Sequence, residues 1–581
     1  RPISILSFAL NYYFTGLDVF YFKLTNLVIH LISGFLLYQL SYRLLLRHTL
    51  SHTHEAVVPL KLPLVGLSVA LVWLLHPLNL TSVLYVVQRM TSLASLFSVL
   101  GVLGYVLGRE QILRGQRRGF VTMLASLLLF GLLAALTKEI GILLPVYVLL
   151  VELFFYRAAA ADTLRRPFKW FFYTIIVTPL VLGLCLALVK SGTLLALDGY
   201  QTRNFTLTER LLTESRVVWF YLKLVVTPTL GELGTYHDDI AISSGLLKPM
   251  TTLFAVAGIA GMLVLSVLSF RRAPILGFGL AWFLLGHSLE STVVPLEMAH
   301  EHRNYLPQVG ILLCIIYYAS HTASKHLKTQ NLRYLAIFGF TTLMAIITYA
   351  RATEWKDEWT LFRTEARNHP DSVRAHTALA VLYNDNKMYP EAGEHFKRAA
   401  ELQRADVETT TRLAQFELVR DGRVSEATLS EMDYRISHYN FTVVAISQFA
   451  DLLRKAQKHP ESHKRVVELF EKLTGKYQGR LEKKWQLVAY HILADNYEDL
   501  GRHKKAIEYY MLSAKTDPLA YYYLRAALLA AHLGDTAMAD KMMITVSDKK
   551  LPLSETDIEL LAELKQALGQ PSTTQNKKKG D

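Results

Sequence analysis

Long apolar blocks alternate with short polar stretches over residues 1–350, whereas charged side chains run throughout the rest of the chain. A helix that spans a membrane needs about 20 mostly apolar residues. Seven clear candidate spans lie at 22–46, 91–108, 119–136, 140–156, 170–190, 250–270 and 334–350, and three shorter ones at 63–76, 275–287 and 308–320. The pattern predicts an all-α protein that begins with a membrane bundle of about ten transmembrane helices.

The basic residues support this topology, because cytoplasmic loops are enriched in Lys and Arg. Five alternate loops hold two to four basic residues each: Arg43, Arg47 and Lys61; Arg109, Arg114, Arg117 and Arg118; Arg157, Arg165, Arg166 and Lys169; Arg271 and Arg272; and Lys325, Lys328 and Arg333. The short loops at 77–90, 137–139 and 288–305 hold one basic residue each, namely Arg89, Lys138 and Arg303. We therefore expect an outer side that contains 1–21, 77–90, 137–139, 191–249, 288–305 and everything after 350. If the apolar stretch 217–228 crossed the membrane, the later basic loops would lie on the outer side, so this stretch is predicted to be an interfacial helix.

The second half of the chain repeats a helix-turn-helix pattern. The segments "HTALAVLYNDNKMYPEAGEHFKRAAEL" (376–402) and "YHILADNYEDLGRHKKAIEYYMLSAKTDP" (490–518) place small and aromatic residues at matching positions, and they are similar to the tetratricopeptide repeat. Weaker copies lie at 408–438 and 520–549, and 441–480 has the length of one more unit. These units predict an α-solenoid, whose concave face would bind a peptide or protein.

Four segments follow from these patterns. We expect a membrane domain at 1–350, a linker or first helix at 351–370, a tetratricopeptide-repeat domain at 371–565 and a disordered tail at 566–581. Because the chain begins with Arg1 on the expected outer side, a first helix and loop are expected upstream of it.

Composition narrows the function classes. The chain has 581 residues, of which 51% are hydrophobic, and a net charge of +13. The basic loops beside the spans explain much of this charge, and no basic cluster carries a recognition motif, so nucleic acid is not expected as a partner. Both cysteines, Cys185 and Cys314, lie in apolar spans, so no disulfide is expected in the outer domain.

Five polar clusters fall on the expected outer side. They are "RPISILSFALNYY" with Arg1 and Asn11, "HPLNLTSVLYVVQRM" with His76, Gln88 and Arg89, "LTKEIG" with Lys138 and Glu139, "GTYHDDIAIS" with His237, Asp238 and Asp239, and "MAHEHRNYLP" with His300, Glu301, His302, Arg303 and Tyr305. Ionisable groups at membrane depth are costly, so each cluster is a functional hypothesis. Each cluster could also have a purely structural explanation, namely a tight turn, a helix end, a solvated loop or an anchor at the membrane interface. Five clusters on one side of one bundle favour a site.

These side chains suit the transfer of a sugar from a lipid phosphate. Arg89, Lys138 and Arg303 supply the cations that a donor phosphate needs. Asp238, Asp239 and Glu301 are candidates for the catalytic carboxylates, and the remaining polar residues of the clusters would line the pocket. A divalent metal ion is the one cofactor considered, with His237, Asp238, Asp239, His300 and His302 as available ligands, although their spacing is not distinctive. The sequence has no Walker loop, dinucleotide fingerprint or nucleophile elbow.

The clusters also carry a family resemblance. Four segments resemble the motifs of transmembrane and tetratricopeptide-repeat-containing O-mannosyltransferase-like proteins: "RPISILSFALNYY", "HPLNLTSVLYVVQRM", "LTKEIGILLPVYVLLVELFF" and "VVPLEMAHEHRNYLPQVG". The second segment ends in Gln-Arg-Met, which is closer to the bacterial branch of the family. The resemblance implies a glycosyltransferase of the C type (GT-C), which uses a polyprenyl-phosphate-linked sugar on the outer face and holds a protein acceptor with its repeats. Two departures matter. The acidic catalytic motif of the family precedes the Arg-Pro segment, so the main catalytic acid is expected upstream of Arg1. In the second motif, "NLTS" replaces the polar pair that often follows His-Pro.

Three functions remain open at this point. The first is a glycosyltransferase of the bacterial inner membrane with periplasmic repeats, or of the eukaryotic endoplasmic reticulum with lumenal repeats. The second is a membrane-anchored tetratricopeptide scaffold for envelope or pilus assembly, but an anchor needs one span rather than ten. The third is a transporter of lipid-linked sugar, but transporters bind their cargo near the middle of the membrane.

Overall fold

The computed structural model describes residues 1–52, 62–189, 200, 203–321, 327–439, 441–477 and 481–570. Helices are the regular elements of this described part, which contains no strand, so the predicted all-α class is confirmed. The chain divides into two compact units: unit 1 comprises Arg1–Tyr200 and Phe205–Ala375, and unit 2 comprises Gln201–Asn204 and His376–Asp581. The predicted loop residues Lys61 and Lys325, and most of the predicted tail, lie outside the described residues.

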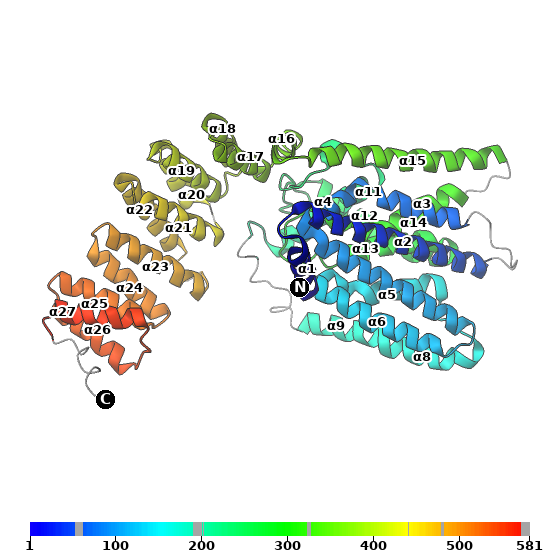
Figure 1. The fold of residues 1–581 in the computed structure, drawn as a ribbon, viewed down its shortest axis with the longest axis horizontal. Helices are drawn as coiled ribbons and strands as arrows, with labels where there is room; N and C mark the ends of the chain where they lie inside the picture. The colour runs from blue at the N-terminus through cyan, green and yellow to red at the C-terminus, as the bar shows by residue number, and fades with distance from the viewer. Residues whose placement is uncertain are drawn as a thin grey trace. The chain divides into compact units, whose positions relative to one another are not determined.

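Unit 1 is a bundle of long helices, many of them roughly parallel or antiparallel (Figure 1). Its α-helices are α1 (Pro2–Thr15), α2 (Val19–His52), α3 (Leu62–Leu74), α4 (Leu80–Leu84), α5 (Arg89–Leu113), α6 (Arg118–Thr137), α7 (Leu144–Val151), α8 (Arg165–Phe172), α9 (Thr178–Val189), α11 (Leu207–Val226), α12 (Thr251–Arg272), α13 (Pro274–His287), α14 (Gln308–His321), α15 (Leu327–Glu354) and α16 (Glu358–Asn368). The short turns η1 (Pro77–Asn79), η3 (Glu139–Leu143), η4 (Glu152–Tyr156) and η9 (Glu301–Asn304) join several of them.

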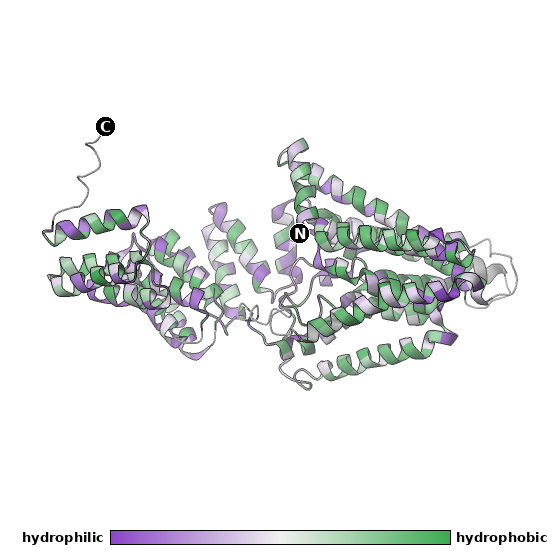
Figure 2. Cartoon of the chain, turned by 90° about the horizontal axis from the view of Figure 1, so that it is seen from below, coloured by the Kyte–Doolittle hydropathy of each residue, from purple (hydrophilic) through white to green (hydrophobic). Residues whose placement is uncertain are grey.

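Six described helical segments are long and apolar enough to cross a membrane, namely Val19–Ser51, Val86–Leu113, Arg118–Thr137, Glu139–Tyr156, Thr251–Arg272 and Leu332–Glu354. If the bent helix pair Leu62–Leu74 and Pro77–Leu84 is counted as one span, the described residues contain up to seven candidate spans. The helices α13 and α14 are apolar but shorter. Apolar residues dominate these helices (Figure 2). Each predicted span overlaps described helical segments, but 170–190 is divided among α8, Tyr173–Val177 and α9 and is not among the segments long and apolar enough to cross a membrane. The helix α11 lies where the interfacial helix is predicted. The number of spans stays a prediction.

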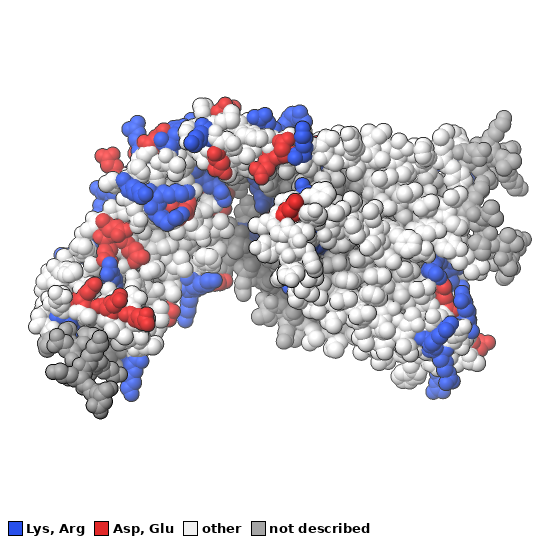
Figure 3. Space-filling model, viewed as in Figure 1, with Lys and Arg blue, Asp and Glu red and all other residues white. Residues whose placement is uncertain are grey.

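The two ends of unit 1 differ in charge. At one end, which we call the basic end, Arg43 of α2 pairs with Glu110 of α5 at 2.8 Å, and Arg109 of α5 pairs with Glu152 of η4 at 2.8 Å. In the view of Figure 3, charged side chains gather near this end and the flank of the bundle beside it is almost uncharged. The opposite end, which we call the polar end, is formed by the starts of α2, α5 and α14 and by the ends of α3, α6, α13 and α15. The predicted polar clusters gather there.

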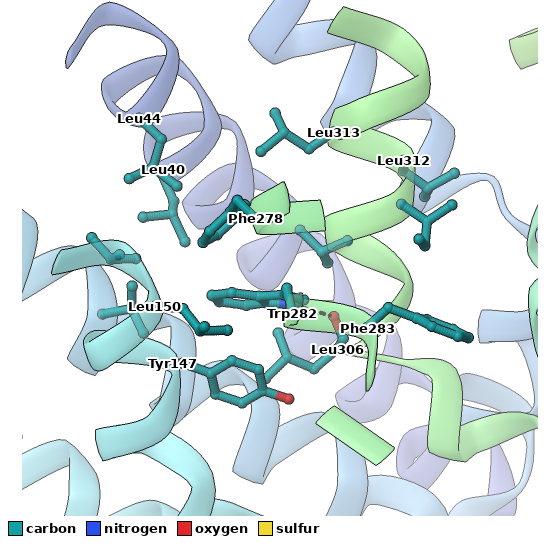
Figure 4. Close-up of a cluster of buried hydrophobic side chains, with 14 of the residues drawn as sticks. Leu40, Leu44, Tyr147, Leu150, Phe278, Trp282, Phe283, Leu306, Leu312 and Leu313 are labelled. Atoms are coloured by element: carbon teal, nitrogen blue, oxygen red, sulfur yellow. Dashed lines mark hydrogen bonds between the residues drawn. The ribbon is translucent and has the colours of Figure 1, made fainter. Parts of the chain in front are cut away.

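Large aromatic side chains fill the centre of the bundle (Figure 4). The rings of Tyr147 and Trp282 lie 4.2 Å apart between centroids, and the indole N–H of Trp282 donates to the carbonyl oxygen of Leu306 at 3.0 Å. Beside them α13 and α14 approach closely at Gly279 and Gly310. A Cβ added at Gly279 would lie 2.5 Å from the carbonyl oxygen of Gly310, so only glycine fits there.

This contact gives a test of the bundle. Replacing Gly279 by leucine is expected to lower the free energy of unfolding by about 1–3 kcal/mol, because the new side chain meets a backbone carbonyl that cannot move alone. The matched control is Gly261→Leu on α12, where an added Cβ meets nothing within 4 Å. Thermal unfolding in detergent measures both variants. Equal midpoints would contradict the close packing of α13 on α14.

Unit 2 consists of consecutive short helices. They are α17 (Val373–Asp385), which starts in unit 1, α18 (Tyr389–Leu402), α19 (Glu408–Asp421), α20 (Glu426–His438), α21 (Val444–Ala456), α22 (Pro460–Lys476), α23 (Lys483–Asp499), α24 (His503–Thr516), α25 (Ala520–His532), α26 (Thr536–Asp548) and α27 (Glu555–Ala567). The pattern residues Ala494, Tyr497, Ala506 and Tyr510 are all buried between helices. The divergent stretch 441–480 also forms a helix pair.

Candidate functional site

The segment "MAHEHRNYLP" places its polar side chains in three surroundings. Its central residues form the turn η9, in which Glu301, His302 and Arg303 are all buried. Tyr305 enters the core: its hydroxyl lies 2.9 Å from Nδ1 of His30, and its carbonyl oxygen accepts a hydrogen bond from the indole of Trp73 at 2.8 Å. Tyr305 therefore packs in the bundle, although it was predicted to shape the pocket. The other side chains of η9 contribute to two separate polar sites.

The first site is a small pocket at the polar end, which we call the Lys138 pocket. Its lining comes from α5, η3, α7, α13 and the segment around η9, and consists of Thr91, Ser95, Ser98, Ile140, Tyr147, Gly286, Glu290, His302, Arg303, Leu306 and Pro307. Lys138 contacts two of these residues. Its ammonium group pairs with Glu290 at 2.7 Å and donates to the hydroxyl of Thr91 at 3.0 Å.

Charge in the Lys138 pocket is arranged in pairs. Burial disfavours ionisation of Glu290, but Lys138 and Arg303 outweigh burial and hold the pKa of this carboxyl below its usual value. Burial also lowers the pKa of His302, with help from the charge of Lys138, so its imidazole is neutral at pH 7. The site therefore combines an ionised carboxylate, two cations and a neutral imidazole.

The three predicted phosphate-binding cations have different partners. The guanidinium of Arg303 donates to the carbonyl oxygens of Met298 at 2.8 Å and Glu297 at 2.7 Å, and Arg303 is one of the residues that line the Lys138 pocket. The guanidinium of Arg89 is fully buried and bonds to Asn26 Oδ1 at 2.7 Å and to two backbone carbonyls of α1 and α2. Arg89 thus fastens helices together in this structure, whereas Arg303 lines the Lys138 pocket and Lys138 bonds to two residues of its lining.

The second site, which we call the His237 cluster, consists of His237, Asp239, Glu301, Arg351, Glu365 and His369. Oε1 of Glu301 accepts a hydrogen bond from the backbone N–H of Gly234 at 2.8 Å and lies 3.5 Å from Nη2 of Arg351. Burial raises the pKa of Glu301 to about 7 against the pull of Arg351. Asp239 accepts from Nδ1 of His369 at 2.9 Å, and although burial opposes it, this bond raises the pKa of His369 above its usual value.

The remaining predicted residues have structural partners. Arg1 and Glu139 form an exposed pair at 2.8 Å. His76 bonds through both ring nitrogens to the backbone, at Leu78 N and Val225 O, as a helix-end residue does. Asp238 accepts from the Ser372 hydroxyl at 2.5 Å and from Arg374 N at 3.0 Å. Asn11 is half-buried on α1. The side-chain oxygen of Gln88 accepts a hydrogen bond from the hydroxyl of Thr91, and the imidazole of His300 bonds to the carboxylate of Glu297.

The available metal ligands gather differently from the sequence expectation. Among the described residues, His237 and Asp239 are joined by His369, which the sequence did not single out, in one group of possible ligands. Asp238 and His300 are held by other partners, and His302 lines the Lys138 pocket. His369 comes from beyond α16, so spacing along the chain could not have linked it to "GTYHDD".

Sequence reasoning also missed several buried charges. Glu290 pairs with Lys138, Arg351 faces Glu301, and Glu214 lies with Arg210 at 2.8 Å and Arg303 at 3.7 Å. A signal was present for some of them. Glu290 is an isolated acid just after an apolar block, and Arg351 is a lone base at the end of one.

Glu214 gives a pH test of this charge network. Burial raises its pKa from 4.5 to about 7, although Arg303 and Arg210 oppose the shift. The folded state therefore keeps a proton that the unfolded state loses, and stability falls as pH rises from 4.5 to about 7, by roughly 3 kcal/mol. Glu214→Gln should remove this part of the slope, which denaturant unfolding at the two ends of that range measures. An unchanged slope in the variant would contradict the raised pKa.

Comparisons with known proteins point in one direction. A family model described as tetratricopeptide repeat matches residues 487–518. The chain is 19% identical over 433 residues to Protein O-mannosyl-transferase F38B6.6 of Caenorhabditis elegans, which covers 69% of this chain and 53% of that protein. It is 22% identical over 455 residues to Protein O-mannosyl-transferase Tmtc3 of Drosophila melanogaster (70% and 49%), and 32% identical over 144 residues to Protein O-mannosyl-transferase TMTC4 of Homo sapiens (24% and 19%). The chain thus spans about half the length, or less, of these curated relatives, and the similarity supports the predicted resemblance.

Proposed function

We propose that this protein is a membrane glycosyltransferase of the C type that moves a sugar from a polyprenyl-phosphate-linked donor to a hydroxyl group of a protein. The relatives are named protein O-mannosyl-transferases, so mannose is the sugar to test first. The observation that carries the proposal is the Lys138 pocket, in which a buried Lys138–Glu290 pair, His302 and Arg303 meet. Buried charges at membrane depth are functional sites by default.

The chemistry of such a transfer explains these residue types. The bond between the sugar carbon and the phosphate oxygen breaks, and negative charge collects on the leaving polyprenyl phosphate. Lys138 and Arg303 would stabilise this charge from a pocket that is largely shielded from water, where each charge counts for more. The sugar carbon forms a new bond to the acceptor oxygen, which must lose its proton to a base.

The proton of the acceptor hydroxyl needs a carboxylate base. Glu290 is ionised and lines the pocket, so it qualifies as a proton acceptor or as a group that orients Lys138. Glu301 and Asp239 belong to the His237 cluster instead, where they bond to the backbone of Gly234 and to His369. We therefore place Glu290 ahead of Asp238, Asp239 and Glu301 as the carboxylate of the transfer within this chain.

The difference in charge between the two ends of unit 1 supports a proposed orientation in the membrane. The basic end would face the cytoplasm and the polar end the outer compartment. For a bacterial inner-membrane protein this compartment is the periplasm, and for a eukaryotic one it is the lumen of the endoplasmic reticulum. The repeats of unit 2 would lie on the same side and bind the protein acceptor or a partner, since stacked repeats offer an extended binding surface.

The direct test uses the full gene product. Purified in detergent and supplied with polyprenyl-phosphate mannose and extracts of outer proteins from cells that lack the gene, it should add the mass of one hexose to acceptor peptides. Polyprenyl-phosphate glucose and nucleotide-linked mannose serve as the comparison donors. Transfer from none of the lipid-linked donors would favour the scaffold function.

A further inference from the structure

Three possible metal ligands meet in the His237 cluster. His237 and Asp239 come from the loop before α12, and His369 follows α16. One ligand atom from each lies within 4.8 Å of the others. Asp239 and His369 are already 2.9 Å apart, and the imidazole rings of His237 and His369 meet edge to face at 5.4 Å between centroids.

Polar atoms without partners point to a ligand in this cluster. In the described part of the chain, Nε2 of His237 is buried and has no hydrogen-bond partner, whereas the imidazole of His369 bonds to Asp239 and faces the backbone of Leu233. The side chain of His237 is only 2% exposed and lies 3.9 Å, through Nε2, from Oε1 of Glu301. The second oxygen of Glu301 is likewise buried without a partner. Folded proteins rarely leave so many buried polar atoms unsatisfied at one place unless a water or an ion serves them.

We propose that His237, Asp239 and His369 bind a divalent transition-metal ion, with zinc as the best match, and that this ion fastens the loop before α12 to the segment after α16. Two imidazoles and one carboxylate suit zinc, whereas magnesium and calcium prefer oxygen ligands throughout. Tetrahedral zinc holds nitrogen and oxygen ligands roughly 3.3 Å apart, so the three side chains need only a small inward movement.

The rest of the site fits this role. Asp239 keeps a side chain that is 26% exposed, which leaves a path for an ion to enter from solvent. Glu301 stands beside His237 as a candidate fourth ligand. The site is distinct from the Lys138 pocket, and the proposal does not depend on sugar transfer. A metal ion here would also fix the backbone of η9, which supplies residues to both sites.

The experiment compares four forms of the full chain purified in detergent without an affinity tag. They are the wild type, Asp239→Asn, His369→Gln and the matched control Asp238→Asn. Asn at position 239 still accepts a hydrogen bond from His369, so this variant separates loss of metal from loss of fold. Each form is stripped with a chelator and reloaded with Zn²⁺ or Co²⁺. Metal content, Zn²⁺ titration and the visible absorption of Co²⁺ are then measured.

The expected result is about one ion per wild-type chain, with a Co²⁺ spectrum of a four-coordinate site. Asp239→Asn and His369→Gln should bind Zn²⁺ at least ~10-fold more weakly, and Asp238→Asn should match the wild type. A wild type that takes up no Zn²⁺ after reloading would overturn the proposal. So would an Asp239→Asn variant with wild-type affinity, or a control that loses the ion as fully as the ligand variants.

Discussion

Replacing Lys138 by methionine is expected to stop sugar transfer and to destabilise the bundle. Methionine has nearly the length of lysine but no charge, so Glu290, which is only 13% exposed, loses its ion-pair partner and keeps only the more distant charge of Arg303. Breaking a buried ion pair from one side costs about 3–5 kcal/mol, far more than the pair itself contributes. The loss of one of the two pocket cations should lower the transfer rate by at least about 100-fold.

A double variant separates the two effects. In Lys138→Met/Glu290→Gln the charge left behind is removed, so most of the lost free energy of unfolding should return while transfer stays absent. Denaturant unfolding and the mannose-transfer assay are the two readouts. The control is Lys223→Met, whose ion pair with Glu232 is exposed and should contribute no more than about 1 kcal/mol. Recovery of transfer in the double variant would show that Lys138 has a structural role alone.

The architecture was largely accessible from the sequence, because burial in lipid leaves a local signal. Each predicted span overlaps described helical segments, since a segment that crosses a membrane must be apolar over its own length. The repeat pattern located the helices of unit 2 for the same reason, as Ala494 and Ala506 mark close helix packing within one short segment. The length of the divergent stretch 441–480 was enough to predict one more repeat unit there, and this stretch contains the helix pair α21 and α22.

The site was accessible only in part, because its pairs join distant segments. Lys138 and Arg303 were recognised as polar residues in apolar surroundings, but their partner Glu290 was not. His76 and Arg89 carried the same signal, yet their ring nitrogens and guanidinium bond to the chain itself. A single sequence does not distinguish a buried polar residue that serves the backbone from one that serves a ligand, because both need the same side chain.

Arg351 joins the end of α15 to the turn η9 and to α16. Its side chain is 1% exposed; it pairs with Glu354 at 2.7 Å and lies 3.5 Å from Glu301 and 3.9 Å from Glu365. Arg351→Met leaves these carboxylates without their shared cation, so the free energy of unfolding should fall by about 3–5 kcal/mol. Because Glu365 receives backbone hydrogen bonds from the loop at Thr235, the loss should loosen α16 first.

Hydrogen exchange resolved by segment tests this order of events. Amides of 358–368 should exchange much faster in Arg351→Met, at conditions in which the core around Trp282 stays protected. The matched control is Arg374→Met, because Arg374 pairs with Glu297 at the surface with 46% of its side chain exposed, and its loss should cost less than about 1 kcal/mol. If both variants exchange alike in this segment, Arg351 does not fasten α16. If Arg351→Met instead exposes the whole bundle at once, the charge network of η9 stabilises unit 1 as a whole rather than one helix.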